Sequence, residues 1–159
     1  TPASGIYPRS LTDALPISVV VQVPQVSAQP DHFTAWDAAG LVVWAVGFVF
    51  ETVADAQLAR FKADPRSAGQ VMDQGLWRYS RHPNYFGECL IGWGLFLMAL
   101  SVPGGAWTVI SPIIITLVLL KMTGVALTER TIVEHRPAYR DYQRRTSTFI
   151  PWRPKPADR

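Results

Sequence analysis

Residues 38–50 read AAGLVVWAVGFVF, so every position in this stretch is apolar or glycine. The helix that the stretch predicts begins near Thr34, an N-cap residue with Asp37 three positions later. It continues past two acidic residues to about Lys62. At 1.5 Å per residue it covers roughly 40 Å, which exceeds the ~30 Å hydrocarbon core of a bilayer. We therefore predict a transmembrane helix whose last turns leave the membrane.

Two more apolar stretches follow along the chain. The first of them runs from Tyr85 to about Val102, and the other runs from Ala106 to Leu127 with Pro112 as a predicted kink. Pro103-Gly104-Gly105 forms an uncharged turn between them. Charged residues make up only 17% of the chain, below the usual quarter. We expect an all-α fold: a polytopic helical membrane protein, with about three transmembrane helices in this chain plus a cytoplasmic tail helix, surrounded by the lipid bilayer.

The positive charges predict an orientation. Lys and Arg gather in residues 60–81 and after Leu127, whereas the turn around Gly104 has no charge. Two spans joined by that turn place both basic stretches on one side of the membrane, and the positive-inside rule makes that side cytoplasmic. A nucleic-acid-binding patch is the alternative interpretation, but the apolar stretches between the charges favour membrane topology. We therefore predict no nucleic-acid partner.

Residues 1–33 differ from the rest because five prolines break any long helix there. They also lack the basic start and apolar core of a signal peptide. We predict a poorly ordered or non-native leader at 1–33, a helical membrane domain at 34–153 and a short tail at 154–159. The single cysteine, Cys89, excludes an internal disulfide, and no Cys/His cluster has metal-ligand spacing, so no metal site is predicted.

The motif RHPNYFGE, residues 81–88, concentrates polar residues at the start of an apolar span. An acid at the centre of a span costs on the order of 2.5–3.5 kcal/mol, so such residues usually face a cavity or a partner. Asn84 and Glu88 are four apart and share a helix face, as do Glu51 and Asp55. Snorkelling or mutual pairing is the structural alternative. Both pairs lie at cytoplasmic span ends, so they predict a polar pocket shared with four basic residues: Lys62, Arg78, Arg81 and His82.

The start of this span also favours an anionic ligand. Pro83 suits the first helical turn, where its missing N–H costs nothing. Free N–H groups and the positive end of the helix dipole attract an anion there, and Arg81 adds a bidentate clamp. A predicted helix after the third span adds further polar side chains: Glu129, Arg130, Glu134, His135, Tyr139 and Tyr142. We expect residues 148–152 to end this helix as an apolar anchor that folds back on the membrane.

Residues 75–88, GLWRYSRHPNYFGE, and residues 136–146, RPAYRDYQRRT, resemble a group of bacterial membrane proteins placed beside the steroid 5-alpha reductases. The resemblance covers about residues 35–153. It implies a membrane enzyme that uses cytoplasmic NADPH to saturate a conjugated carbon–carbon double bond in a hydrophobic, lipid-like or steroid-like substrate. It makes residues 34–153 the C-terminal, cofactor-binding part of that enzyme. A bacterial inner membrane is the location that it implies.

The resemblance also implies roles for individual residues. The reductase Asn and Glu that contact the cofactor correspond to Asn84 and Glu88. An Asp and an Arg on the preceding helix correspond to Asp55 and Lys62, while Glu51 stands where the reductases have Asn. We assign these residues to cofactor binding, together with Arg78, Arg81 and His82 of the predicted pocket, and leave the catalytic residues unassigned.

Two departures from the reductase pattern matter. An ungapped match places the reductase Arg, His and Tyr of the tail helix at Leu127, Thr131 and His135, so His135 and Tyr139 serve as cofactor contacts only if the helix is shifted by one turn. The substrate-side Glu and Tyr of the reductases lie on earlier helices, which this sequence lacks. We therefore expect the N-terminal helices of the same protein as partners, and no reduction by this chain alone.

A second resemblance leads to an alternative. The isoprenylcysteine and phospholipid methyltransferases also carry an Arg-His-Pro-x-Tyr-x-Gly motif, which residues 81–87 match, and they bind S-adenosylmethionine there. Their tail helix usually starts with paired acids, whereas here Glu129 is followed by Arg130. The match at Asp55 and Lys62 favours the reductase. A non-catalytic scaffold that holds anionic lipids on its basic face is the third hypothesis.

Overall fold

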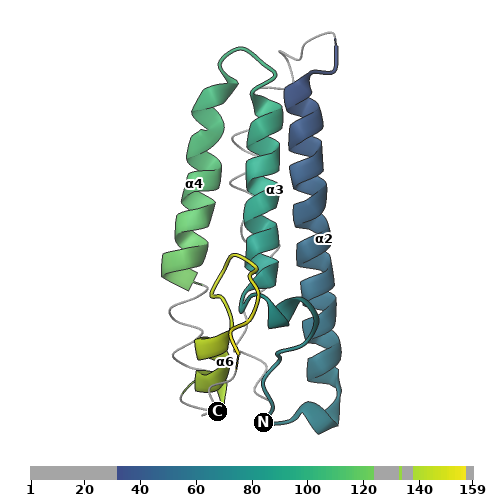
Figure 1. Ribbon diagram of the computed structural model, residues 1–159. Helices are drawn as coiled ribbons and strands as arrows, with labels where there is room; N and C mark the ends of the chain where they lie inside the picture. The colour runs from purple at the N-terminus through teal and green to yellow at the C-terminus, as the bar shows by residue number, and fades with distance from the viewer. Residues whose placement is uncertain (1–31, 124–132, 134–137, 157–159) are drawn as a thin grey trace.

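The computed structural model describes residues 32–123, 133 and 138–156, and the regular elements within those ranges are helical. Helices α2 (Ala35–Ala63), α3 (Pro83–Ala99) and α4 (Ile110–Leu117) lie side by side, and successive helices run in opposite directions (Figure 1). The most extensive contact between helices is that of α2 with α3. The all-α fold class is therefore confirmed for the described part of the chain.

Helix α2 begins and ends close to the predicted positions. The Thr34 hydroxyl accepts a hydrogen bond from the backbone N–H of Asp37 at 3.2 Å, and the Asp37 carboxylate accepts one from the Thr34 N–H at 2.8 Å. This capping box satisfies two N–H groups that the first turn would otherwise leave without partners. The helix ends at Ala63, where Asp64 adopts an extended conformation. The predicted N-cap is confirmed, and the predicted end differs by one residue.

Two pairs of glycines bring α2 and α3 into close contact. Gly47 lies against Gly87, where a Cβ atom on Gly47 would stand 2.6 Å from the Gly87 carbonyl oxygen. Gly40 lies against Gly94 in the same way, also at 2.6 Å. The glycines of each helix are seven residues apart, so they share one face. Small residues at such positions let two helix backbones approach closely, which is a common way of packing helices in membranes.

The number of membrane spans remains a prediction. Within the described residues, α2 is the one helix that is long and apolar enough to cross a membrane, which by itself gives modest support for membrane association. Helix α3 has 17 residues, and the third apolar stretch forms a shorter helical run, Gly105–Leu120. The predicted third span continued to Leu127, and residues 124–127 lie outside the described residues.

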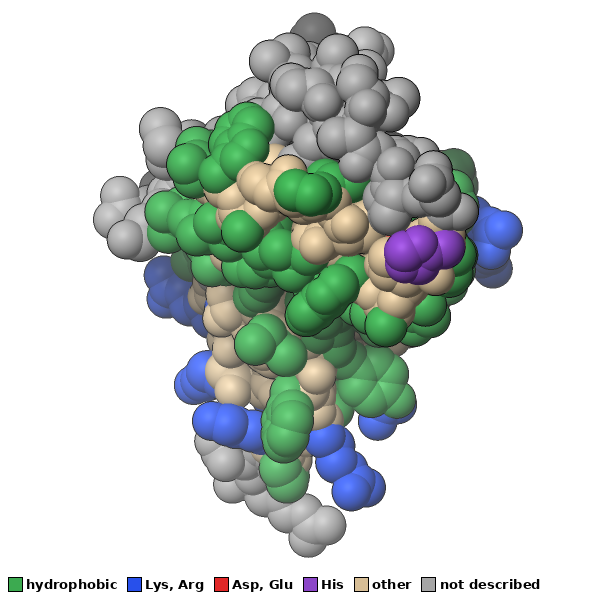
Figure 2. Space-filling view, turned by 90° about the horizontal axis from the view of Figure 1, so that it is seen from above, with side chains coloured by type: hydrophobic (Ala, Val, Ile, Leu, Met, Phe, Trp, Pro, Cys, Tyr) green, Lys and Arg blue, Asp and Glu red, His purple; other side chains and the backbone are tan. Residues whose placement is uncertain are grey.

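The surface of α2 that faces away from α3 is apolar. Its exposed side chains include Val42 at 64% and Val49 at 56%. Seen from the end of the bundle that carries the Gly104 turn, hydrophobic side chains cover most of the described face, and Lys and Arg appear only toward its margins (Figure 2). Apolar surface of this extent marks a contact with lipid or with other protein.

The turn between α3 and α4 depends on two glycines. Gly104 has φ +82°, a left-handed conformation that glycine adopts without strain. A Cβ atom on Gly105 would collide with the carbonyl oxygen of Ala99. The chain then continues through a 3₁₀ segment, η4 (Gly105–Val109), into α4. The Pro103-Gly104-Gly105 turn that the sequence predicts therefore lies at the expected place.

Helix α4 is less regular than the sequence suggests. Pro112, the predicted kink, lies in its first turn, where proline removes no helical hydrogen bond. The irregular part is the next segment, η5 (Val118–Thr123), which is a π-helix. Such segments contain wider turns and are frequent at functional sites. This change was not predictable, because residues 113–120, which lead into the segment, are apolar apart from Thr116.

The end of the bundle opposite the Gly104 turn is built from loops. After α2 come two 3₁₀ segments, η2 (Pro65–Ser67) and η3 (Gly75–Arg78). The buried indole of Trp77 donates a hydrogen bond to the Ala54 carbonyl at 3.0 Å, and the Leu76 N–H donates one to the Gln57 side chain at 3.0 Å. These two bonds attach the loop to the last turns of α2.

The tail folds back against the residues that precede α3. Helix α6 (Tyr139–Arg145) is followed by an extended segment in which Ser147 forms an isolated bridge with Ser80. The Trp152 N–H donates to the Tyr79 carbonyl at 2.9 Å. The described part of the predicted tail helix includes α6, and residues 134–137 lie outside the described residues. Within residues 148–152, the Phe149 ring packs edge-to-face on Phe86, whereas Ile150 and Trp152 are exposed.

Candidate functional site

Four polar side chains from α2 and α3 gather at the loop end of the bundle, and we call them the acidic cluster: Glu51, Asp55, Asn84 and Glu88. Glu51 is only 2% exposed, and Asn84 and Glu88 are each 8% exposed. Asn84 donates its amide N–H to the Asp55 carboxylate at 3.1 Å. The Glu51 backbone lies against Gly87, since a Cβ atom there would stand 2.6 Å from the Glu51 nitrogen. The pairs that the sequence placed on two separate helices therefore meet.

Two atoms of the acidic cluster have no hydrogen-bond partner among the described residues. They are the Glu51 Oε1 oxygen and the Asn84 Oδ1 oxygen, and both are acceptors. A buried polar atom without a partner costs about 1–3 kcal/mol, so structures rarely keep one without a reason. Two such acceptors, one on each of two helices in contact, suit a ligand that carries N–H donors.

The predicted basic residues do not all join the acidic cluster. Lys62, at the exposed end of α2, is attracted by the charge of Asp55. Arg78 ends η3 and lines a different cleft, together with Arg145 of α6.

Arg81 is buried and holds the tail. Its guanidinium donates to the Gln143 carbonyl at 3.1 Å and to the Thr148 hydroxyl at 2.5 Å, and its backbone N–H donates to the Ser147 carbonyl at 2.9 Å. Two of the N–H groups that the sequence assigned to an anion thus bind protein oxygens. Arg81 shapes the site by fixing the tail across the start of α3.

His82 is buried at the N-cap position of α3 and stacks on the Tyr85 ring, with a centroid separation of 5.4 Å. Its backbone N–H donates to the Ser80 hydroxyl at 3.1 Å, and that hydroxyl donates to the Phe149 carbonyl at 2.7 Å. Pro83 occupies the first helical turn, as predicted. These contacts fix the direction in which α3 starts, and so fix where Asn84 points.

Of the two tail residues predicted to contact the cofactor, one lies within the described residues and the other does not. Tyr139 is buried at the start of α6, and its ring lies edge-to-face with that of Tyr142 at 5.4 Å. Tyr142 in turn donates its hydroxyl to the Trp77 carbonyl. His135 lies outside the described residues. Tyr139 therefore packs where the tail meets the loop after α2, and its role as a cofactor contact stays a prediction.

The tail attachment gives a testable prediction. Arg81→Lys replaces a planar group that reaches two acceptors by an ammonium that reaches one of them. Loss of one charged hydrogen bond, worth about 1.5–3 kcal/mol, should speed amide hydrogen exchange across residues 139–152 roughly tenfold or more. Arg140→Lys, at an exposed position of α6, is the matched control and should leave exchange unchanged. Equal exchange in both variants would show that Arg81 does not hold the tail.

The described part of the chain has an all-helical fold, with one candidate membrane span and a buried acidic cluster between two helices. The chain belongs to the DUF1295 family, a family of proteins of unknown function, which matches residues 11–146. An uncharacterised protein of the fission yeast Schizosaccharomyces pombe is 32% identical over 139 residues, covering 75% of this chain. The chain spans 40% of the length of that yeast protein. No solved structure matches the chain.

Proposed function

We propose that the chain is the cofactor-binding part of a membrane-embedded, NADPH-dependent reductase that saturates a conjugated carbon–carbon double bond in a lipid-like or steroid-like substrate. The observation that carries the proposal is the acidic cluster, in which Glu51 and Asn84 present buried acceptor oxygens without partners among the described residues. The carboxamide of a nicotinamide ring carries two N–H donors, which fit such acceptors. The resemblance to the reductases assigns one of these two residues, Asn84, to the cofactor, together with Glu88.

The residues of the chain have distinct tasks in this proposal. Glu51 and Asn84 bind and orient the cofactor, and the Asn84–Asp55 hydrogen bond keeps the Asn84 amide from rotating. The tight glycine contact between α2 and α3 excludes water beside the cluster. NADPH, when bound, supplies the hydride that reaches the carbon β to the substrate carbonyl. We assign the proton donor and the substrate pocket to the rest of the protein.

The apolar face of α2 needs a covering that the described residues do not provide. The yeast relative is longer than the chain, and α2 exposes a broad apolar face. We propose that the lipid bilayer and further N-terminal helices cover that face, with residues 60–81 and the tail on the cytoplasmic side. A bacterial inner membrane is the proposed location.

The second candidate function is an S-adenosylmethionine-dependent methyltransferase, and one observation favours it. The acidic cluster contains three carboxylic acids, Glu51, Asp55 and Glu88, and a cationic ligand suits them better than a polyanion does. S-adenosylmethionine carries a positive sulfonium and an amino group, whereas NADPH can present only its neutral nicotinamide end here. The methyl acceptor would be a lipid or prenyl group.

A binding comparison tests both functions. The full-length protein in neutral detergent is titrated with NADPH and, separately, with S-adenosylmethionine, and the dissociation constants are measured by calorimetry. We expect NADPH to bind at micromolar concentration and S-adenosylmethionine to bind at least tenfold more weakly. The reverse order would establish the methyltransferase and overturn the reductase. Binding of neither ligand would favour a non-catalytic scaffold.

A further inference from the structure

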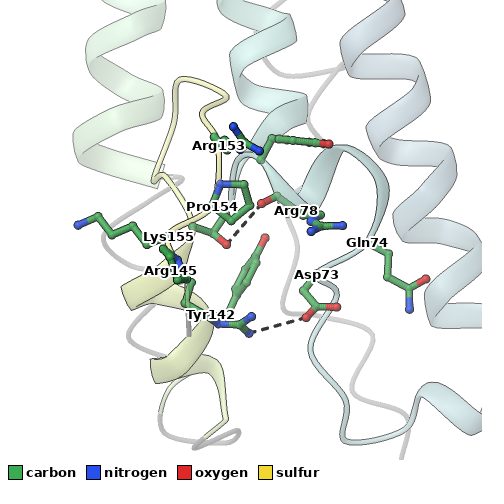
Figure 3. Close-up of a pocket in the computed structure, with 11 residues that line it drawn as sticks. Asp73, Gln74, Arg78, Tyr142, Arg145, Arg153, Pro154 and Lys155 are labelled. Carbon is green, nitrogen blue, oxygen red and sulfur yellow. Dashed lines mark hydrogen bonds and ion pairs between the residues drawn. The ribbon is translucent and has the colours of Figure 1, made fainter. Parts of the chain in front are cut away.

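A basic cleft of about 690 Å³ opens between the loop after α2 and the tail, apart from the acidic cluster (Figure 3). Three arginines line it: Arg78 from η3, Arg145 from the last turn of α6 and Arg153 from the tail. Asp73 is the single acid among the lining residues, and its Oδ2 oxygen lies 3.9 Å from the Nη2 nitrogen of Arg145. Lys155 also lines the cleft, although its ammonium group points away from the centre in Figure 3. The cleft therefore carries a net positive charge.

Backbone contacts hold the walls of this cleft in place. Tyr142 donates its hydroxyl to the Trp77 carbonyl, and the Lys155 N–H donates to the Arg145 carbonyl at 2.9 Å. The Thr146 hydroxyl donates to the Arg78 carbonyl at 3.5 Å. None of these bonds uses a guanidinium group, so the arginines are not needed to form the walls. The cleft thus holds three guanidinium groups against one carboxylate, and an anion would stabilise this excess of positive charge.

The rim of the cleft is apolar and exposed. Tyr79 lines it with 44% of its surface exposed. The backbone N–H of Trp152 donates to the Tyr79 carbonyl at 2.9 Å. The Trp152 side chain is 73% exposed, and Ile150, two residues earlier, is 63% exposed. Tryptophan and tyrosine are enriched where a membrane protein crosses the headgroup layer. Exposed aromatic rings beside a basic cleft therefore fit a membrane surface better than they fit a soluble ligand.

We propose that the basic cleft binds the phosphate headgroup of an anionic phospholipid, with Trp152 and Ile150 inserted in the adjacent headgroup layer. The arginines supply paired N–H donors to the phosphate oxygens, a geometry that suits guanidinium groups. The cleft volume lies within the usual range for small-molecule sites. This site is separate from the acidic cluster, so the inference stands independently of the cofactor that the protein uses.

A titration with short-chain lipids tests the inference. The full chain in neutral detergent is titrated with dihexanoyl phosphatidylglycerol, with zwitterionic dihexanoyl phosphatidylcholine, and with inorganic phosphate or NADPH as competitors. The test variant is Arg145→Gln/Arg153→Gln. The matched control, Arg140→Gln/Arg144→Gln, removes the same charge from the same region of the tail, at residues that line a different surface depression with Asp141. Since each basic group near a headgroup contributes on the order of a few-fold in affinity, the test variant should bind phosphatidylglycerol roughly tenfold more weakly.

Each outcome decides the proposal. Preference for phosphatidylglycerol over phosphatidylcholine, lost in the test variant and kept in the control, supports it. Equal losses of affinity in both variants would show diffuse charge attraction and would overturn the proposal that the cleft is the binding site. Displacement of the lipid by millimolar inorganic phosphate or by NADPH would overturn it in favour of a soluble phosphate ligand. If the double variant fails to fold, Arg153→Gln alone should weaken binding about threefold, and an unchanged affinity there overturns the proposal as well.

Discussion

Gly87→Ala should force α2 and α3 apart and lower the stability of the fold, because the contact between the helices leaves no room for a methyl group at this position. A Cβ atom at Gly87 would lie 2.6 Å from the Glu51 nitrogen and 2.7 Å from the Gly47 carbonyl oxygen. Both are backbone atoms of the facing helix, so no side chain can rotate away and the two helices must separate. Overpacking of this kind costs about 1–3 kcal/mol, occasionally more.

Gly92→Ala is the matched control for this variant. It lies on the same helix, but its Cβ atom would meet Ile115 and Pro112 at 3.7 Å, an ordinary contact distance. Alanine favours a helix over glycine by up to about 1 kcal/mol, so this variant should be neutral or slightly more stable. In thermal unfolding of the chain in detergent, we expect Gly87→Ala to lower Tm by about 5 °C or more and Gly92→Ala to leave it or raise it. Similar Tm values for the two variants would contradict the close approach at Gly87.

Local features of the fold were predictable because their signals are local. Thr34 and Asp37 predicted a capping box three residues apart, and Pro83 predicted the first turn of α3. The turn at Gly104 followed from neighbouring residues in the same way. Local signals could not predict the glycine contact, because Gly47 and Gly87 lie on different helices and their contact depends on how α2 and α3 pack. Their seven-residue spacing from Gly40 and Gly94 was the available signal, and it was missed.

The candidate site likewise combines features that local sequence signals predict with features that depend on packing. Spacing placed Asn84 on one face with Glu88, and the motif marked both as polar within an apolar run, so the acidic cluster was predictable. The tail contacts of Arg81 were not, because the acceptors are a backbone carbonyl and a hydroxyl more than sixty residues away. A carbonyl oxygen carries no sequence signal, and an arginine that binds one looks like an arginine that binds phosphate.

Glu51→Gln should separate ligand binding from stability. The carboxyl of Glu51 is 2% exposed, and its Oε1 oxygen has no partner among the described residues, so it contributes little to folding. An amide of the same shape removes a potential buried charge, and Tm without ligand should stay the same or rise. The ligand loses a charged hydrogen bond worth about 1.5–3 kcal/mol, so NADPH affinity should fall roughly tenfold or more. A gain in stability coupled to a loss of binding is typical of residues kept for function.

Asp37→Asn is a control with the opposite expected result, a loss of stability without a loss of binding. It makes the same carboxyl-to-amide change at the other end of α2, where Asp37 accepts hydrogen bonds from the Thr34 N–H at 2.8 Å and the Thr34 hydroxyl at 2.7 Å. Weakening this cap should cost about 1 kcal/mol of stability while NADPH affinity stays unchanged. If Glu51→Gln instead lowers Tm and leaves the affinity intact, Glu51 is a structural residue and the acidic cluster is not the ligand site. The two carboxyls of one helix thus test whether burial without a partner marks the binding site.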